Sequence, residues 1–314
     1  MGTLNSKIVV VGAGKVGSTV AYTLMMSRLA SEIVLIDVNK DRARGEALDI
    51  SHGIAYLWQI TVREGDYEDC ADADLVIVTA GVGRQPGQTR LDLARTNVGV
   101  VRAIIEGVMK YASDPLLLII SNPVDVLTYM AQKETGLPAS RVIGSGTMLD
   151  TGRFRYLLSD HCKVDVRSVH AFIVGEHGDS ELPLWSHASL ASKPFQEYCD
   201  TCDHPCGGVN RRQMFEDTRD AGIEIIKKKG ATFYGVSLAA ARIVSAVTGD
   251  ENAVLTLSSV LNGQYSLSDV ALSLPCILNR GGIDRFLDLR ISDEEQKLLE
   301  ASAEKLRSVI KEVL

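Results

Sequence analysis

Three glycines in the pattern GxGxxG follow directly after the apolar run of residues 7–11 and open a stretch with helical character. They are Gly12, Gly14 and Gly17. In a strand, turn and helix of this kind, the first glycine permits the tight turn, the second lets a pyrophosphate approach the backbone, and the third lets the helix pack on the strand. The helix N-terminus adds amide donors and positive potential. The pattern predicts a dinucleotide-binding site; the alternative is an ordinary strand-to-helix turn.

An acidic residue stands at the end of the next predicted strand. Asp37 follows Gly17 by 20 residues, where a carboxylate can hydrogen-bond the ribose 2′-hydroxyl of a bound adenosine and repel a 2′-phosphate. This position favours NAD over NADP, unless Asp37 merely caps a loop. The expected cofactor contacts in this region are Gly12, Gly14, Val16, Gly17 and Asp37.

The fold class follows from the alternation of β-rich and helical stretches. Four near-continuous apolar runs, each followed by a loop and helix-like sequence, are typical of parallel strands with helices on both faces; they are residues 7–11, 32–37, 75–80 and 116–121. After about Gly144, longer helical stretches surround shorter β-rich runs; the helices are expected at 212–229 and 292–314, and the strands near 169–174 and 270–278. We expect a Rossmann-type, doubly wound parallel sheet in residues 1–144 and a mixed α+β substrate domain in residues 145–314.

Composition narrows the class of function. The formal net charge of −7 gives no overall field that would attract nucleic acid, so no nucleic-acid partner is expected. No run approaches the roughly 20 apolar residues that span a bilayer, and the sequence shows no signal-peptide pattern before residue 7. We therefore expect a cytoplasmic protein with no membrane partner.

The cysteines give one unusual segment, residues 199–206. With six cysteines and no secretory context, reduced thiols are expected. Four soft ligands in this segment are reminiscent of a zinc knuckle: Cys199, Cys202, His204 and Cys206. Their spacing is cramped, so free surface thiols and no metal are the expectation.

Three residues of the second half form a chemical constellation. Asp150 and Arg153 are three apart on one predicted helix face, and His177 lies in a loop that follows a predicted strand. A histidine beside a buried carboxylate is held in one tautomer and suits proton transfer to and from a ketone. The guanidinium fork of an arginine binds a small acid's carboxylate through two parallel bonds. Taken singly, each residue has an ordinary alternative: a helix cap, a solvated arginine and a loop histidine.

Several segments together resemble the L-lactate dehydrogenase family, and the likeness extends through nearly the whole chain. They are GAGKVG, TAGVGRQPGQTRLDL, IISNPVD, IGSGTMLDTGRFR, VGEHGDSELPLWS and KGATFYG. The resemblance implies reversible hydride transfer between NADH and a small 2-oxo acid. It implies that His177 is the acid/base, that Asp150 is its partner, and that Arg153 anchors the substrate carboxylate.

The same resemblance assigns further residues. Arg90 is implied to be a mobile-loop arginine that polarises the substrate carbonyl, and Asn122 to lie near nicotinamide and substrate. Gly81 is expected beside the cofactor at the base of that loop, whose glycines permit closure. Thr232 is expected to contact the substrate.

One loop position departs from the lactate dehydrogenase pattern. Arg84 stands where that family usually has glutamine and the related malate dehydrogenases have an arginine for a second carboxylate. A buried arginine is compensated by oxaloacetate and left unpaired by pyruvate, which favours acceptance of, and even preference for, oxaloacetate. Glu181 and Thr232 match the lactate type, so an ordinary L-lactate dehydrogenase, with Arg84 in solvent, stays open.

Regulation and assembly are also implied by the resemblance. Arg155 and His170 match the pair that binds fructose 1,6-bisphosphate between subunits of many bacterial lactate dehydrogenases, although Arg155 could simply face solvent. A homo-oligomer, a tetramer, is expected. An alternative of another class, a non-catalytic NAD-binding sensor, would need the nucleotide-binding half but not the chemical constellation. A cofactor-dependent hydrolase lacks a convincing metal set in this sequence.

Overall fold

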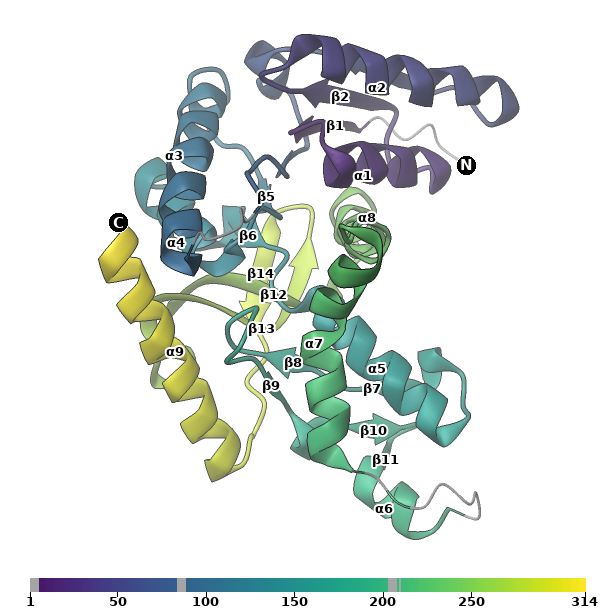
Figure 1. Cartoon of the computed structure of the whole chain (residues 1–314), viewed down its shortest axis with the longest axis vertical. Coiled ribbons are helices and arrows are strands. Elements are labelled where there is room, and N and C mark those ends of the chain that lie inside the picture. The colour runs from purple at the N-terminus through teal and green to yellow at the C-terminus, as the bar shows by residue number, and fades with distance from the viewer. Residues whose placement is uncertain (1–5, 84–88, 203–207, 209) are drawn as a thin grey trace.

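The computed structural model describes residues 6–83, 89–202, 208 and 210–314 of the chain (Figure 1). The α-helices of this part are α1 (Lys15–Met26), α2 (Lys40–His52), α3 (Arg90–Met109), α4 (Val124–Thr135), α5 (Met148–Cys162), α6 (Phe195–Asp200), α7 (Arg211–Lys229), α8 (Tyr234–Thr248) and α9 (Asp293–Val313). The strands are β1 (Lys7–Val11), β2 (Glu32–Ile36), β3 (Thr61–Glu64), β4 (Leu75–Val78), β5 (Leu117–Ile119), β6 (Val142–Gly144), β7 (Val169–His170), β8 (Ile173–Val174), β9 (Leu182–Pro183), β10 (Ser189–Leu190), β11 (Lys193–Pro194), β12 (Ala253–Asn262), β13 (Ser268–Asn279) and β14 (Gly282–Phe286).

In the described residues of the first half, six parallel strands form a sheet. Their order is β3-β2-β1-β4-β5-β6, with β1 between β2 and β4. The strand order therefore reverses beside β1, and in sheets of this type ligands bind at the carboxyl ends of the strands next to such a reversal. The expected Rossmann-type sheet is confirmed, and all four predicted apolar runs contain its strands. Two of its strands were not predicted: β3, which is only partly buried, and the three-residue strand β6.

The sheet continues into the second half of the chain. Strand β12 pairs antiparallel with β6 at Ser258 and Gly144, and β13 and β14 extend the same sheet to nine strands. A Cβ at Gly144 would lie 2.4 Å from the Thr128 hydroxyl oxygen and 3.0 Å from the Ser258 Cβ. Glycine is therefore needed at this contact, which joins the two halves through one continuous sheet.

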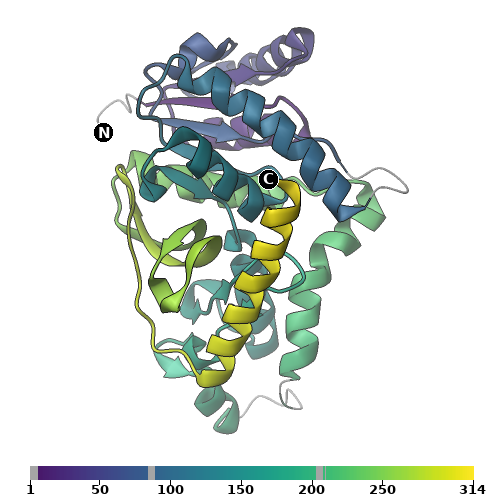
Figure 2. The ribbon, with the colours of Figure 1, turned by 90° about the vertical axis from the view of Figure 1, so that its left-hand side faces the viewer.

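Helices cover both faces of the sheet. Helices α3, α4 and α9 pack on one face with side chains such as Val9 and Val76, and α1, α2 and α8 pack on the other with side chains such as Ile8 and Ile77. Alternate residues of one strand thus enter different cores, which explains why these strands are apolar throughout. Figure 2 shows α9 lying along the molecule with its end beside α3.

A smaller core holds the elements that carry the predicted chemistry. Helix α5 packs through Phe154 and Leu158 against β7, β10 and α6. The predicted long helices at 212–229 and 292–314 correspond to α7 and α9, and the expected strands near 169–174 and 270–278 to β7, β8 and β13. Among the helices in the described ranges, none is both long and apolar enough to cross a membrane.

Candidate active site

A cavity of about 510 Å³ opens where the parallel strands end and the second half packs against them. The Gly81 loop and Asn122 follow β4 and β5, whereas α5, the loop after β8 and α7 line the opposite side. The structure brings seven of the predicted residues together in this lining: Val16, Gly81, Asn122, Asp150, Arg153, His177 and Thr232. The cavity is therefore the candidate site for both cofactor and substrate.

His177 and Asp150 form the centre of the site. Nδ1 of His177 lies 2.6 Å from Oδ2 of Asp150, which is 1 % exposed. The His177 side chain keeps 29 % of its surface exposed toward the cavity. Burial disfavours the charged imidazolium, but the carboxyl groups around it, above all Asp150, outweigh burial and raise the pKa of His177 to about 9. The ring can therefore carry a proton at neutral pH.

Arg153 shares the carboxylate of Asp150. Its Nη1 donates to Oδ1 at 2.7 Å, one turn along the same helix. Despite burial, which favours the neutral acid, the neighbouring His177 and Arg153 lower the pKa of Asp150. The guanidinium has five N–H donors in all, so one bond to Asp150 orients the group and leaves donors for a substrate carboxylate.

The loop that carries His177 is fixed at several points. The backbone N–H of Glu176 donates to the Ser302 hydroxyl of α9 at 2.9 Å, and that of His177 donates to Oδ2 of Asp125 in α4 at 2.7 Å. Gly175 adopts φ +91°, where an added Cβ would lie 2.9 Å from the Ser302 hydroxyl. Asp125, which the sequence reasoning missed, lies in the quoted motif IISNPVD.

Asn97 is a second residue that sequence reasoning missed. Its side chain is 2 % exposed, donates to the backbone carbonyl of Asn122 at 2.7 Å and accepts from the backbone N–H of Val82 at 2.8 Å. It thereby joins the turn after β5 to the base of the loop that begins at Gly81. Its place in α3, away from any recognised motif, gave no signal.

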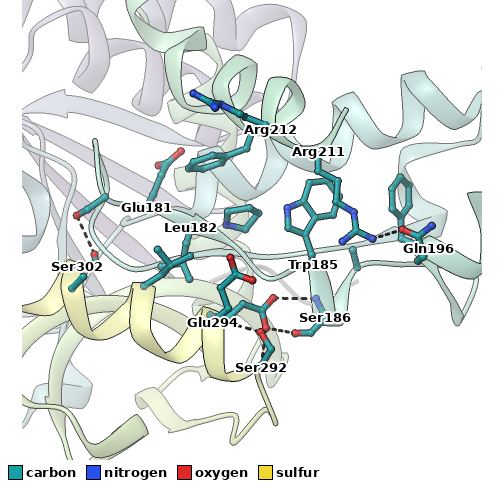
Figure 3. Close-up of a pocket in the computed structure, with 18 of the residues that line it drawn as sticks. Glu181, Leu182, Trp185, Ser186, Gln196, Arg211, Arg212, Ser292, Glu294 and Ser302 are labelled. Atoms are coloured by element: carbon teal, nitrogen blue, oxygen red, sulfur yellow. Dashed lines mark hydrogen bonds between the residues drawn. The ribbon is translucent and has the colours of Figure 1, made fainter. Parts of the chain in front are cut away.

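Glu181 lies in the wall between two cavities. It is 4 % exposed, and its Oε1 has no hydrogen-bond partner within the described part of the chain. Burial and the charge of Asp150 raise the pKa of Glu181 to about 9. Figure 3 shows the other side of this wall, a cavity of about 1010 Å³ between α7 and α9 that is also lined by Trp185 and Glu294.

The glycine turn fits a dinucleotide. Gly12 has φ +109°, and a Cβ there would lie 2.6 Å from the Ala80 nitrogen. A Cβ on Gly17 would lie 1.8 Å from the Gly12 carbonyl oxygen, whereas Gly14 faces open space. This surface of α1, with its N-cap at Gly14 and no acidic residue in the first turn, leaves room and positive potential for a phosphate.

Asp37 lines a cavity of about 460 Å³ beside the glycine turn, with Gly12 and Gly14. Its Oδ2 accepts from the backbone N–H of Ala13 at 2.8 Å, and its Oδ1 from that of Asn39 at 2.8 Å. Each carboxylate oxygen accepts more than one hydrogen bond. The alternative that Asp37 caps a loop is thus partly right, because its carboxylate binds the backbone of the turn. The same carboxylate also lines the cavity that could hold an adenosine.

Some predicted residues are not placed. Arg84, His204 and Cys206 lie outside the described residues, and Arg90 is described only as the first residue of α3. Cys199 and Cys202 are half-buried at the end of α6. The structure therefore leaves untested the expectations for the loop arginines and for this segment.

The predicted effector pair lies apart from this site. Arg155 and His170 line a small cavity of about 160 Å³. The Arg155 Nε donates to the Val169 carbonyl at 2.8 Å, and burial lowers the pKa of Arg155. Arg155 and His170 therefore line the same cavity, but part of the Arg155 guanidinium is already hydrogen-bonded to the backbone.

Comparison with known proteins gives consistent matches over the whole chain. Residues 6–144 match the profile described as lactate/malate dehydrogenase, NAD binding domain, and residues 147–314 match that of the alpha/beta C-terminal domain. An L-lactate dehydrogenase of Acetivibrio thermocellus is 51 % identical over 97 % of this chain and 96 % of its own length. L-lactate dehydrogenase 1 of Clostridium acetobutylicum is 48 % identical over 96 % and 97 %.

Solved structures agree with these matches. A lactate dehydrogenase from a Medee basin deep-sea metagenome library superposes with a TM-score of 0.95 at 42 % identity, covering 98 % of this chain and 99 % of that one. The ligand-bound minor L-lactate dehydrogenase of Enterococcus mundtii gives a TM-score of 0.94 at 43 % identity, covering 99 % of each chain.

Proposed function

This chain belongs to the lactate/malate dehydrogenase family, and from that premise we propose that it interconverts pyruvate and L-lactate. It is an NAD-dependent oxidoreductase of the lactate dehydrogenase type. The observation that carries the choice of chemistry is the group formed by His177, Asp150 and Arg153 around one cavity. The same observation disfavours a non-catalytic NAD sensor, because a sensor needs neither an acid/base pair nor an arginine that binds a substrate carboxylate.

Each of the three side chains has a separate role in the reaction. Arg153 binds the carboxylate of pyruvate and so places the adjacent carbonyl toward His177. The protonated His177 ring donates its Nε2 proton to the carbonyl oxygen, and Asp150 stabilises the charge of the ring before that transfer. In the reverse direction the neutral ring takes the proton from the lactate hydroxyl.

The glycine turn and the cavity between the two halves would hold NAD. The turn at Gly12 and Gly14 would receive the pyrophosphate, Asp37 the adenosine ribose, and Val16, Gly81 and Asn122, which line the cavity, the nicotinamide end. When bound as NADH, the cofactor supplies the hydride. The proton then comes from a group of the chain itself, which is the role of His177.

Charge in the site supports pyruvate as the substrate. Of the two arginines in the described lining, Arg153 is assigned to the first carboxylate and Arg219 forms a bidentate pair with Asp220 at 2.8 and 3.0 Å. Burial and the charge of Asp150 raise the pKa of Glu181 to about 9, which favours its neutral form. A second substrate carboxylate would meet the same unfavourable environment.

Arg84 remains the one residue that favours oxaloacetate. The expectation that malate or oxaloacetate is preferred rests on this arginine alone, and the curated relatives cited above are named L-lactate dehydrogenases. We therefore give pyruvate as the substrate and keep oxaloacetate as the alternative. Comparison of the two substrates separates these proposals.

We also propose that Arg155 and His170 bind the phosphate of fructose 1,6-bisphosphate between subunits of a homo-oligomer, a tetramer. The small cavity that both residues line supports this assignment. Added bisphosphate should then raise activity at low pyruvate, and Arg155→Gln should abolish that response. An unchanged rate with and without the bisphosphate would remove the effector proposal but leave the catalytic one intact.

The test of the function is NADH oxidation, followed by absorbance, with pyruvate as acceptor. We expect turnover by the parent protein and a loss of about a hundredfold or more in His177→Asn, with NADH binding retained. His187→Asn is the matched control, because this half-buried histidine contacts the Arg290 carbonyl outside the cavity. Equal rates in the parent and His177→Asn would refute the assignment.

A further inference from the structure

A buried carboxylate of the nucleotide-binding half holds the backbone of the acid/base residue. Asp125 lies in the first turn of α4, is 2 % exposed, and accepts the backbone N–H of His177 at 2.7 Å. The two residues are 52 positions apart. This hydrogen bond therefore connects the half that binds the cofactor with the loop that carries the proton donor.

The same short turn also reaches the cavity. Asn122 lines the cavity with His177 and lies three residues before Asp125, and the Asn97 side chain holds its carbonyl. Residues 122–125 thus contact the cavity at one end and the His177 backbone at the other. A shift of the His177 loop relative to this turn would change the position of the ring relative to the cofactor site.

Two anchors on His177 have different effects. Asp150 fixes the orientation of the ring through Nδ1, but α5 belongs to the second half, so this bond does not set the distance to the nucleotide-binding half. Asp125, by contrast, bonds the His177 backbone directly to the nucleotide-binding half. Hydride and proton must reach neighbouring atoms of one carbonyl group, and misplacement by about 1 Å can lower a rate a hundredfold.

We propose that Asp125 is a positioning residue, whose ionised carboxylate holds the acid/base loop in register with the nucleotide-binding half. This inference rests on the proposed dehydrogenase function, because it needs His177 to be the acid/base. A charged acceptor forms a stronger and shorter hydrogen bond than a neutral one. Protonation of Asp125 therefore loosens the connection without removing it.

The surroundings of Asp125 place this protonation near physiological pH. Burial raises the pKa of Asp125 to about 6, while the Ser258 hydroxyl of β12 and the amide and charge of His177 oppose the rise. Glu176 in the same loop favours the neutral acid, but α9 compensates it through Lys305 at 3.2 Å. The hydrogen bond from the His177 backbone to the ionised Asp125 carboxylate is thus present above about pH 6. It is replaced by the weaker bond to the neutral acid as the pH falls through that value.

The test compares kcat for pyruvate reduction between pH 5 and 8 in the parent and Asp125→Asn. Asparagine matches the protonated acid in shape and keeps an oxygen acceptor for the His177 amide. We expect the parent to exceed Asp125→Asn by about fivefold at pH 7.5, the difference between a charged and a neutral acceptor. The two should converge at pH 5, because the profile of the variant lacks the step near pH 6.

Two further variants give the test its controls. Ser258→Ala removes a group that favours the ionised acid, so the step in kcat should move to higher pH and persist. Asp125→Ala should lower kcat further than Asp125→Asn, with the KM for NADH unchanged in both. A parallel pH profile in the parent and Asp125→Asn overturns the proposal, and so does a KM for NADH that changes as much as kcat. Absence of activity with every 2-oxo acid in the parent would instead refute the proposed function.

Discussion

Nδ1 of His177, in the loop after β8, lies 2.6 Å from Oδ2 of Asp150, a buried carboxylate in the first turn of α5. In this arrangement the protonated ring is stabilised by a charge that water does not screen, so the pKa of His177 rises to about 9 despite burial. The site is therefore ready to donate a proton at neutral pH, which suits reduction of a ketone.

The first prediction concerns pH. Reduction of pyruvate needs the protonated ring, so its kcat should stay level between the Asp125 step near pH 6 and the His177 pKa, and fall as the pH rises through about 9. Oxidation of lactate needs the neutral ring and should rise over the same interval. Asp150→Asn removes the stabilising charge and should move the fall to lower pH by about one to three units.

Asp165→Asn is the control for that measurement, because Asp165 is an exposed acid that pairs with Arg167 away from the cavity. Its profile of kcat against pH should coincide with that of the parent. A fall at the same pH in Asp150→Asn and the parent would show that Asp150 does not set the protonation of His177.

The second prediction concerns the substrate carboxylate. Arg153→Leu should raise the KM for pyruvate by about a hundredfold, because a charge-assisted pair is lost in a partly buried site. Arg153→Lys should recover only part of that loss, since an ammonium group lacks the guanidinium fork. Arg167→Leu, at an arginine outside the cavity, provides the control. An unchanged KM in Arg153→Leu would exclude Arg153 as the anchor.

The third prediction concerns the choice of nicotinamide cofactor. Asp37 faces the adenosine cavity and binds the backbone of the glycine turn. Asp37→Ser removes the charge that repels a 2′-phosphate, so kcat/KM for NADPH should rise relative to that for NADH. Thermal unfolding of the variant checks that the turn survives. If the parent already uses both cofactors equally at low concentration, Asp37 does not discriminate.

Local sequence patterns predicted the Rossmann-type sheet well. The continuous apolar runs correspond to β1, β2, β4 and β5 because both faces of each strand are buried, and the glycine pattern fixes where α1 begins. The extension of the sheet through β12 was not predictable, because it depends on one pairing between Ser258 and Gly144, residues far apart in the sequence.

In the candidate site, too, some residues could be predicted from local sequence and others could not. His177, Asp150 and Arg153 were found because their side-chain chemistry is distinctive. Asp125 and Asn97 were missed because their contribution is a hydrogen bond to a backbone group, 52 residues away for Asp125 and 25 for Asn97. No local spacing records such a bond, and a buried acid or amide in a helix resembles an ordinary cap.

The central claim is that the substrate is pyruvate, and the ratio of its kcat/KM to that of oxaloacetate, both measured with NADH, tests it most directly. Burial at Glu181, the charge of Asp150 and the pairing of Arg219 disfavour a second carboxylate, so pyruvate should be preferred by about tenfold or more, the effect of roughly 1.4 kcal/mol. Arg84→Gln should leave that order unchanged. A higher kcat/KM for oxaloacetate in the parent, reversed in Arg84→Gln, would contradict the account and show that Arg84 selects the substrate.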